Sequence, residues 1–170
     1  IYDFGRKKLM KYDWYEMNSV TNLPIIEGDS IQNKEVNFFS GKIMENNYLI
    51  ASIYYGMNKP IVICNKDLKI INSVGVIPDE RHKSQALISY GGHISCFGNK
   101  FVFVMEALGY IACYELQNDG KERLLWDHFL EKPIYKGDQL DRKHLKLGFP
   151  EVKMTKNYIF CSYFGERLTR

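Results

Sequence analysis

YLIASIYYG (48–56), KFVFVMEALG (100–109) and NYIFCSYFGE (157–166) are three copies of one apolar pattern. Each copy has the length of a strand and follows an Asn-bearing tight turn. The copies recur at intervals of roughly 50 residues, a period typical of the blades of a β-propeller. The composition agrees, because the chain is rich in Tyr and Phe, which favour strands over helices. We therefore predict an all-β fold, a β-propeller of four-stranded antiparallel blades.

Each copy occupies the same place in a longer unit of four strands. An alternating segment precedes it and a hairpin follows it, and the second of these hairpins carries Asn118-Asp119-Gly120, a strong signal for a tight turn. We predict one partial propeller domain over residues 1–170. Its parts are the third and fourth strands of a cut blade (1–17), a full blade (36–75), a second full blade (91–129) and the first two strands of another cut blade (151–170).

These parts add up to about three blades of sheet, whereas propellers close with roughly four to eight. Two interpretations follow. The chain is a piece of a longer protein that forms a six-bladed ring, or two copies of the chain associate through their open blade edges and complete one ring together. We favour the first interpretation, and the second stays open.

Several segments resemble the TolB-like six-bladed propeller proteins of Bacteroides and relatives. The resemblance is carried by IYDFGRKKLMKYDWYEM (1–17), by DLKIINSVGVIPDE (67–80) and by the strand YIACYEL (110–116). Within them, Asp3-Phe4-Gly5 with Lys11-Tyr12-Asp13, and Val74-Gly75 with Pro78, stand where that family has matching residues. These motifs mark where strands turn and end, so they concern the fold rather than any chemistry.

The resemblance implies a chain of about twice this length, with a lipoprotein-type or other secretory signal, that lies in the cell envelope. Residues 1–170 themselves contain no signal segment, and they begin with Ile1. The family offers no catalytic residues to carry over, because its members are mostly uncharacterised. Periplasmic or lipid-anchored localisation is therefore an expectation from the resemblance alone.

The longest connections are expected on one face of the blades. Successive strands run antiparallel, so the connections near residues 14–36, 76–91 and 130–150 leave the same face. Long loops on a rigid scaffold commonly carry binding residues. Aromatic and cationic side chains of this face suit an acidic glycan, a carboxylate or a protein partner. The predicted binding residues are Tyr54, Tyr55, Arg81, His82, Arg142, His144 and Arg167.

The alternative for this face is that its mixed charges only keep the loops in solvent. The formal net charge is +3 and both signs are interspersed, so we predict no nucleic-acid partner. No apolar run approaches the ~18 residues of a membrane span, so we predict no transmembrane segment in this chain. The predicted partner is a protein or a carbohydrate.

The chain lacks the patterns of the common catalytic and metal sites. Its four histidines show none of the spacings of a zinc site, and GxSxG and phosphate-binding loop motifs are missing. We predict no catalytic, metal-binding or cofactor-binding residues and no cofactor. The predicted function is a non-catalytic binding or scaffold module of the cell envelope. The alternative is a propeller enzyme, a metal-dependent lyase or hydrolase acting on a sugar or lactone.

The cysteines lie singly inside apolar runs, at Cys64, Cys96, Cys113 and Cys161. We interpret them as small buried hydrophobic residues. A disulfide between neighbouring blades stays open, because sequence does not establish its geometry.

Overall fold

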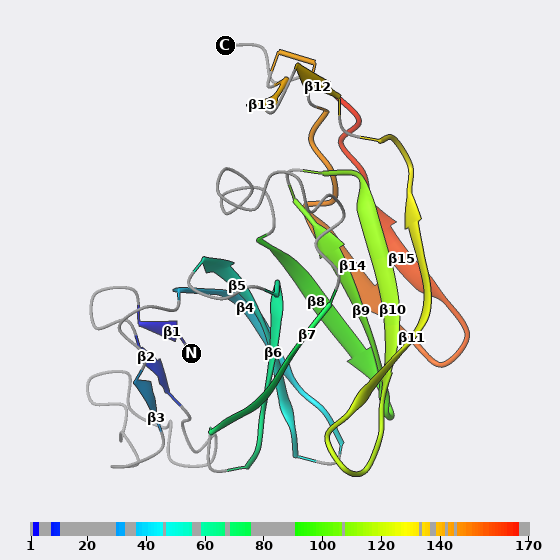
Figure 1. The fold of residues 1–170 in the computed structure, drawn as a ribbon. Helices are drawn as coiled ribbons and strands as arrows, with labels where there is room; N and C mark the ends of the chain where they lie inside the picture. The colour runs from blue at the N-terminus through cyan, green and yellow to red at the C-terminus, as the bar shows by residue number, and fades with distance from the viewer. Residues whose placement is uncertain are drawn as a thin grey trace, which may run out of the picture.

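A computed structural model of the chain contains strands and turns and, in the residues that it describes, no helix (Figure 1). The described residues are 2–3, 8–10, 30–32, 37–45, 47–55, 59–66, 69–75, 91–106, 108–132, 134–136, 139–141, 143–144 and 146–166. The prediction of an all-β fold is confirmed for these residues.

Two four-stranded antiparallel sheets form the body of the molecule, and both are simple meanders. The first sheet has the order β4-β5-β6-β7 and the second the order β8-β9-β10-β11. The first consists of β4 (Asn37–Ile43), β5 (Leu49–Tyr55), β6 (Ile61–Cys64) and β7 (Ile70–Val74). The second consists of β8 (Gly92–Phe97), β9 (Lys100–Met105), β10 (Tyr110–Leu116) and β11 (Glu122–Phe129).

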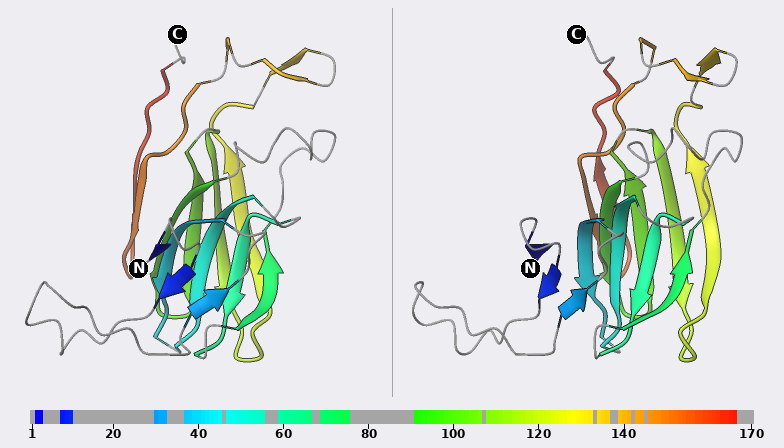
Figure 2. Two further views of the ribbon diagram at one scale, coloured as in Figure 1. Left: turned by 90° about the vertical axis from the view of Figure 1, so that its left-hand side faces the viewer. Right: turned by 60° about the vertical axis from the view of Figure 1, so that its left-hand side comes forward.

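Three smaller groups of strands accompany these sheets. They are the sheet of β1 (Tyr2–Asp3), β2 (Lys8–Met10) and β3 (Ser30–Gln32), the hairpin of β12 (Tyr135–Lys136) and β13 (Gln139–Leu140), and the hairpin of β14 (Glu151–Met154) and β15 (Ile159–Ser162). In Figure 1 the β1-β2-β3 sheet lies on the side of the first sheet and β14–β15 on the side of the second. Figure 2 shows β12–β13 extending beyond the ends of the sheets.

The second sheet is an inner layer with apolar contacts on both faces. One face of β9 carries Phe101, Phe103 and Met105, which pack in one cluster with residues of the first sheet. The other face carries Val102 and Val104, which pack against residues of β14–β15. All five side chains are fully buried. Burial on both faces explains why this strand is a continuous apolar run rather than an alternating one.

Two serine side chains form hydrogen bonds between neighbouring sheets. The fully buried Ser52 of β5 donates a hydrogen bond to the carbonyl of Gly92 at the start of β8. The hydroxyl of Ser95 in β8 accepts a hydrogen bond of 2.9 Å from the backbone N–H of Met154 in β14. These hydrogen bonds place β8 between the first sheet and the β14–β15 hairpin. Strand β8 also contacts β4 on one side and β14 on the other.

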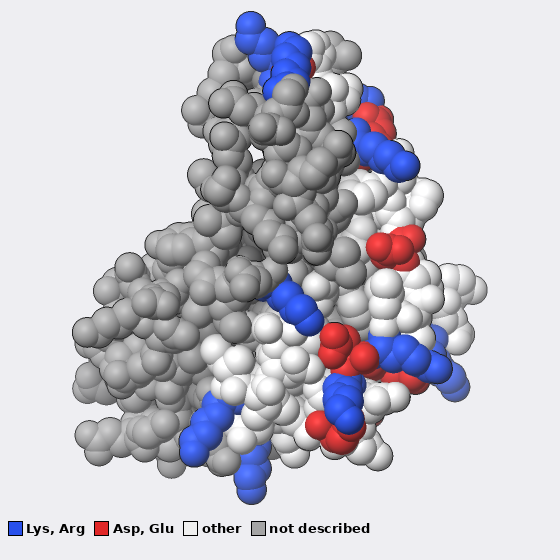
Figure 3. Space-filling view, viewed as in Figure 1, with Lys and Arg blue, Asp and Glu red and all other residues white. Residues whose placement is uncertain are grey.

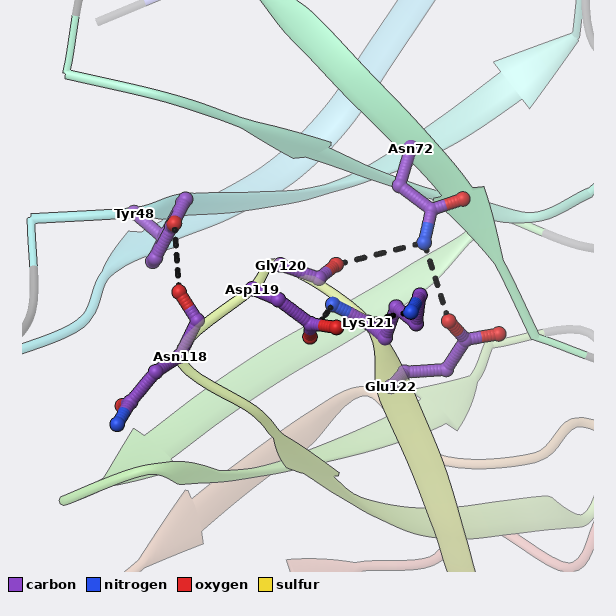
Figure 4. Close-up of polar contacts among 7 residues, drawn as sticks. All are labelled: Tyr48, Asn72, Asn118, Asp119, Gly120, Lys121 and Glu122. Atoms are coloured by element: carbon purple, nitrogen blue, oxygen red, sulfur yellow. Dashed lines mark hydrogen bonds and ion pairs between the residues drawn. The ribbon is translucent and has the colours of Figure 1, made fainter.

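A polar contact joins the two sheets at the end where their turns are short (Figure 4). The Tyr48 hydroxyl donates to the Asn118 carbonyl at 3.4 Å. The Asn72 side-chain amide donates to the Glu122 carboxylate at 3.1 Å and to the Gly120 carbonyl at 3.4 Å. The turn between β10 and β11 therefore rests on the first sheet.

The predicted units at 36–75 and 91–129 coincide closely with the two observed sheets, and the four-stranded antiparallel pattern is confirmed. Their assembly in a propeller ring stays a prediction. Two segments interpreted as plain connections contain strands instead: Ser30–Gln32 pairs with β2, and the segment 130–150 contains β12–β13. These strands are only two or three residues long and show no alternation that would announce them in the sequence.

Candidate functional site

The candidate site lies at the end of the sheets where the long connections emerge. Backbone hydrogen bonds join one of them, the segment 130–150, to the short β9–β10 connection. Leu130 donates to the Gly109 carbonyl at 2.8 Å, and Gly148 donates to the Glu106 carbonyl at 2.7 Å. The β9–β10 connection is thereby flanked by both ends of the segment that leads from β11 to β14. The connections after β9 and after β11 thus lie on one face, whereas the other two long connections, near 14–36 and 76–91, lie largely outside the described residues.

A buried carboxylate organises the outermost part of this face. Asp141, only 7% exposed, directly follows β13. One of its oxygens, Oδ2, accepts a hydrogen bond from the Lys136 ammonium at 2.9 Å and lies 2.7 Å from Nδ1 of His144. Its other oxygen, Oδ1, accepts the backbone N–H of Lys143 at 3.2 Å. One carboxylate therefore holds the β12–β13 hairpin and the turn that follows it in a single arrangement.

Backbone hydrogen bonds of the β12–β13 hairpin and of the turn after it bring Lys136 and His144 close to Asp141. The Asp141 N–H donates to the Ile134 carbonyl at 2.8 Å, which closes the hairpin, and the His144 N–H donates to the Asp141 carbonyl at 3.0 Å. Lys136 pairs with Gln139 across the hairpin. The ion pair of Asp141 with Lys136 and the contact with His144 are therefore local in sequence.

The electrostatics of the cluster favour an ionised Asp141. Hydrogen bonds from Lys136, first, and from His144 lower the pKa of the Asp141 carboxyl to about 2. The side chains of Lys136 and His144 remain 67% and 42% exposed. Since Nδ1 of His144 faces the carboxylate, the other ring nitrogen, Nε2, is the one free to meet a ligand. We call Lys136, Asp141, Lys143 and His144 the Asp141 cluster.

A second ion pair lies in the same segment between β11 and β14. Lys146 pairs with Glu131, and both side chains lie near Tyr163. Burial, and the charge of Glu131, raise the pKa of Tyr163. The buried Tyr163 hydroxyl has no hydrogen-bond partner among the described residues, and its ring packs on Phe149 at 5.2 Å. Tyr163 therefore lies between this ion pair and the apolar cluster that contains Phe149.

Positive charge exceeds negative charge along this connection. Figure 3 shows lysine side chains gathered over the β12–β13 end of the molecule. The described charged residues of the segment are Lys132, Lys136, Lys143 and Lys146 against Glu131 and Asp141. Both carboxylates are already paired with a lysine. Among the described residues of this segment the lysines outnumber the carboxylates, and an excess of positive charge suits an anionic ligand.

The structure describes the side chain of one predicted binding residue, His144, and places it in the Asp141 cluster. Tyr54 and Tyr55 lie at the end of β5, and only their backbone is described. The predicted binding residues Arg81, His82, Arg142 and Arg167 lie outside the described residues.

Lys136, Asp141 and Lys143 were not among the predicted binding residues. Their signal was the Gly137-Asp138 dipeptide, a tight-turn pattern that brings Lys136 towards the residues after it.

The four cysteines lie in strands and are buried or half-buried. All four are free thiols; Cys64 and Cys113 are buried, as predicted, whereas Cys96 and Cys161 are only half-buried. Burial raises the pKa of Cys64 to about 12 and also raises the pKa values of Cys96, Cys113 and Cys161. A thiol with a raised pKa is a weak nucleophile at neutral pH.

Two further findings concern metals and membranes. Among the described residues no three His, Cys, Asp or Glu side chains are grouped so that they could hold a metal ion. The same residues include no helix with the length and apolar character needed to cross a membrane.

Comparison with known proteins adds no family. No family model matches the chain, no curated protein is similar to it, and no solved structure matches it. The resemblance to TolB-like propellers therefore rests on the quoted motifs alone.

Proposed function

We propose that the chain is part of a β-propeller scaffold whose long-loop face binds an anionic ligand. The scaffold part rests on three successive antiparallel units. Each begins with the repeated strand pair, and the first strands of successive units pack on one another. A six-bladed, TolB-like ring in the cell envelope, periplasmic or lipid-anchored, is the form of this scaffold that the sequence motifs favour.

One observation carries the binding proposal: a nearly buried carboxylate, Asp141, holds exposed cationic and imidazole groups in a fixed arrangement. A salt bridge that only kept a loop in solvent would not need a buried anchor, since exposed pairs contribute little to stability. A pre-formed cationic group, in contrast, loses little conformational entropy when a carboxylate ligand binds. An acidic carbohydrate is the ligand class that we favour.

Binding of polygalacturonate, a carbohydrate with a carboxylate on every sugar, tests this proposal. We expect Lys136→Ala and Lys143→Ala each to weaken binding by about three- to ten-fold, and added salt to weaken it further. Lys66→Ala and Lys156→Ala are matched controls, because both lysines are exposed on short turns away from this face. Loss of binding in the controls, or equal binding by all variants, would contradict the proposal.

The alternative, a metal-dependent propeller lyase or hydrolase, stays a hypothesis. No specific observation on the described residues favours it over a binding module. Turnover of a polyuronate or a lactone that increases on addition of calcium or zinc would support it.

A further inference from the structure

A tyrosine hydroxyl is buried at the long-loop face without a hydrogen-bond partner. Tyr163 follows β15, and its half-buried ring packs on Phe149 at 5.2 Å. The hydroxyl itself is buried, and none of the described residues forms a hydrogen bond with it. Buried polar groups are nearly always hydrogen-bonded, because an unpaired one costs free energy. A phenylalanine would fill the same space without this cost, so packing alone does not explain the hydroxyl.

Two glycines pack against the Tyr163 ring at its two edges. A Cβ at Gly109, in the β9–β10 connection, would lie 3.4 Å from Cε2 of the ring and 3.4 Å from the hydroxyl oxygen. A Cβ at Gly165 would lie only 2.9 Å from Cε1, on the opposite edge. Backbone therefore approaches the ring closely on both sides, and the hydroxyl has a defined position.

Two charged side chains lie near this hydroxyl. The Cβ position at Gly109 that lies 3.4 Å from the hydroxyl is also 3.5 Å from the backbone nitrogen of Glu131. The Glu131 carboxylate pairs with the Lys146 ammonium, and both charges act on the phenol: beyond the effect of burial, Glu131 raises the pKa of Tyr163 and Lys146 lowers it. Solvent reaches the pair, because the two side chains are 47% and 34% exposed. We call Glu131, Lys146 and Tyr163 the Tyr163 site.

We propose that the Tyr163 site binds one carboxylate of the anionic ligand, which replaces Glu131 on Lys146 and accepts a hydrogen bond from the Tyr163 hydroxyl. This inference rests on the proposed function and adds a second subsite for the same class of ligand. Exposed ion pairs contribute little to stability, so the replacement of Glu131 by another carboxylate costs little. The incoming carboxylate gains a hydrogen bond that Glu131 does not make, and hydrogen bonds to ionised acceptors are the strong ones.

The Tyr163 site and the Asp141 cluster belong to the same connection. Glu131 precedes β12, and Lys146 follows the turn that contains His144. A polyuronate carries a carboxylate on every sugar and can therefore engage both places, whereas a single uronate engages one at a time. Monomeric galacturonate is thus the probe that separates the Tyr163 site from the Asp141 cluster.

Titration with galacturonate, followed by NMR through the backbone amides of Gly109 and Glu131, tests the proposal. Tyr163→Phe should weaken binding about ten-fold, because the bound carboxylate loses a hydrogen bond. It should not lower the melting temperature, because the hydroxyl has no partner among the described residues of the free chain. Tyr158→Phe is the matched control, since Tyr158 is exposed at the short-turn end. Glu131→Gln removes the competing carboxylate and should tighten binding roughly two- to five-fold.

The outcomes separate this inference from the proposed function. If polygalacturonate binding depends on Lys136 and Lys143, but galacturonate binds equally to the wild type, Tyr163→Phe and Glu131→Gln, the inference is overturned and the proposed function stands. The expected galacturonate results together with polymer binding that ignores Lys136 and Lys143 would support the inference and contradict the proposed function. Amide signals that galacturonate does not shift, or a lowered melting temperature of Tyr163→Phe, would also overturn the inference, the latter because the hydroxyl would then serve the folded chain alone.

Discussion

Ser52 is the residue whose hydrogen bonds matter most for the contact between the two large sheets. Its side chain is fully buried, donates to Gly92 of the second sheet and accepts the backbone N–H of Ser40 at 3.1 Å. We expect Ser52→Ala to lower the free energy of unfolding by about 1–3 kcal/mol, because buried partners lose their hydrogen bond. Urea denaturation measures this.

Ser162→Ala is the matched control for that prediction, because Ser162 has the same place in the repeat but is exposed. In dilute solution, where chains are separate, it should change the free energy of unfolding by less than about 0.5 kcal/mol. Equal effects of the two substitutions would show that burial of Ser52 between the sheets is not what stabilises the contact.

Asp141 makes a pH-dependent contribution to stability. Its pKa is about 2 in the folded chain, below the ordinary value of 3.8, because Lys136 and His144 stabilise the ionised form. The contribution is therefore complete above about pH 5 and is lost progressively as the pH falls through 2. We expect the difference in unfolding free energy between the wild type and Asp141→Asn to shrink over this interval. Denaturation at several pH values measures it, and a difference that does not vary with pH would contradict this account.

At the scale of elements, the turn between β10 and β11 packs against β7 of the first sheet. Gly120 in this turn has φ = 79°, and a Cβ there would lie 2.9 Å from Cδ1 of Ile71 in the first sheet. Gly98 in the β8–β9 turn also has a positive φ, 58°, but a Cβ there would meet nothing. Gly98→Ala should cost about 1 kcal/mol for the backbone alone, and Gly120→Ala should cost more.

A third substitution separates the two causes. Ile71→Val removes the terminal methyl group that a Cβ at position 120 would contact. It should therefore recover part of the stability lost in Gly120→Ala and none of that lost in Gly98→Ala, as measured by thermal denaturation. Equal costs for the two glycine variants, with no recovery, would mean that the turn does not press on the first sheet.

The long strands were predictable because their signals are local. Apolar runs such as Phe101–Met105 and the Asn118-Asp119-Gly120 turn indicate strands and hairpins without knowledge of the rest of the chain. Strand β3 was not predictable, because pairing with β2 rather than its own composition makes it a strand. For β12–β13 the sequence offers only the Gly137-Asp138 turn pattern, because strands of two residues show no alternation. Of the four residues of the Asp141 cluster only His144 was predicted, from its place in a long connection. The burial of Asp141 and its contact with His144 depend on the folded hairpin, which sequence patterns do not describe.

At the scale of the whole molecule, layers are covered to different extents. Side chains of β9 are buried on both faces by the first sheet and by β14–β15. The first sheet is also covered on its other face, where Val62 and Cys64 are fully buried. The hairpin β14–β15, in contrast, leaves its outer face in solvent. In stacked repeats each unit depends on its neighbours, so a unit covered on one face only should open most easily.

Native-state hydrogen exchange in dilute solution tests this order of stability. We expect amides of β9 to exchange most slowly and amides of β15 fastest. Val152→Ala removes a buried contact of the hairpin and should accelerate exchange in β14–β15 roughly ten-fold while leaving β5 and β6 unchanged, because their contacts are with the other face of the stack. An equal acceleration in β4–β7, β8–β11 and β14–β15 would contradict this order, because it would mean that the three sheets open only together. The loss of the Val152 contact would then reach the first sheet through β9.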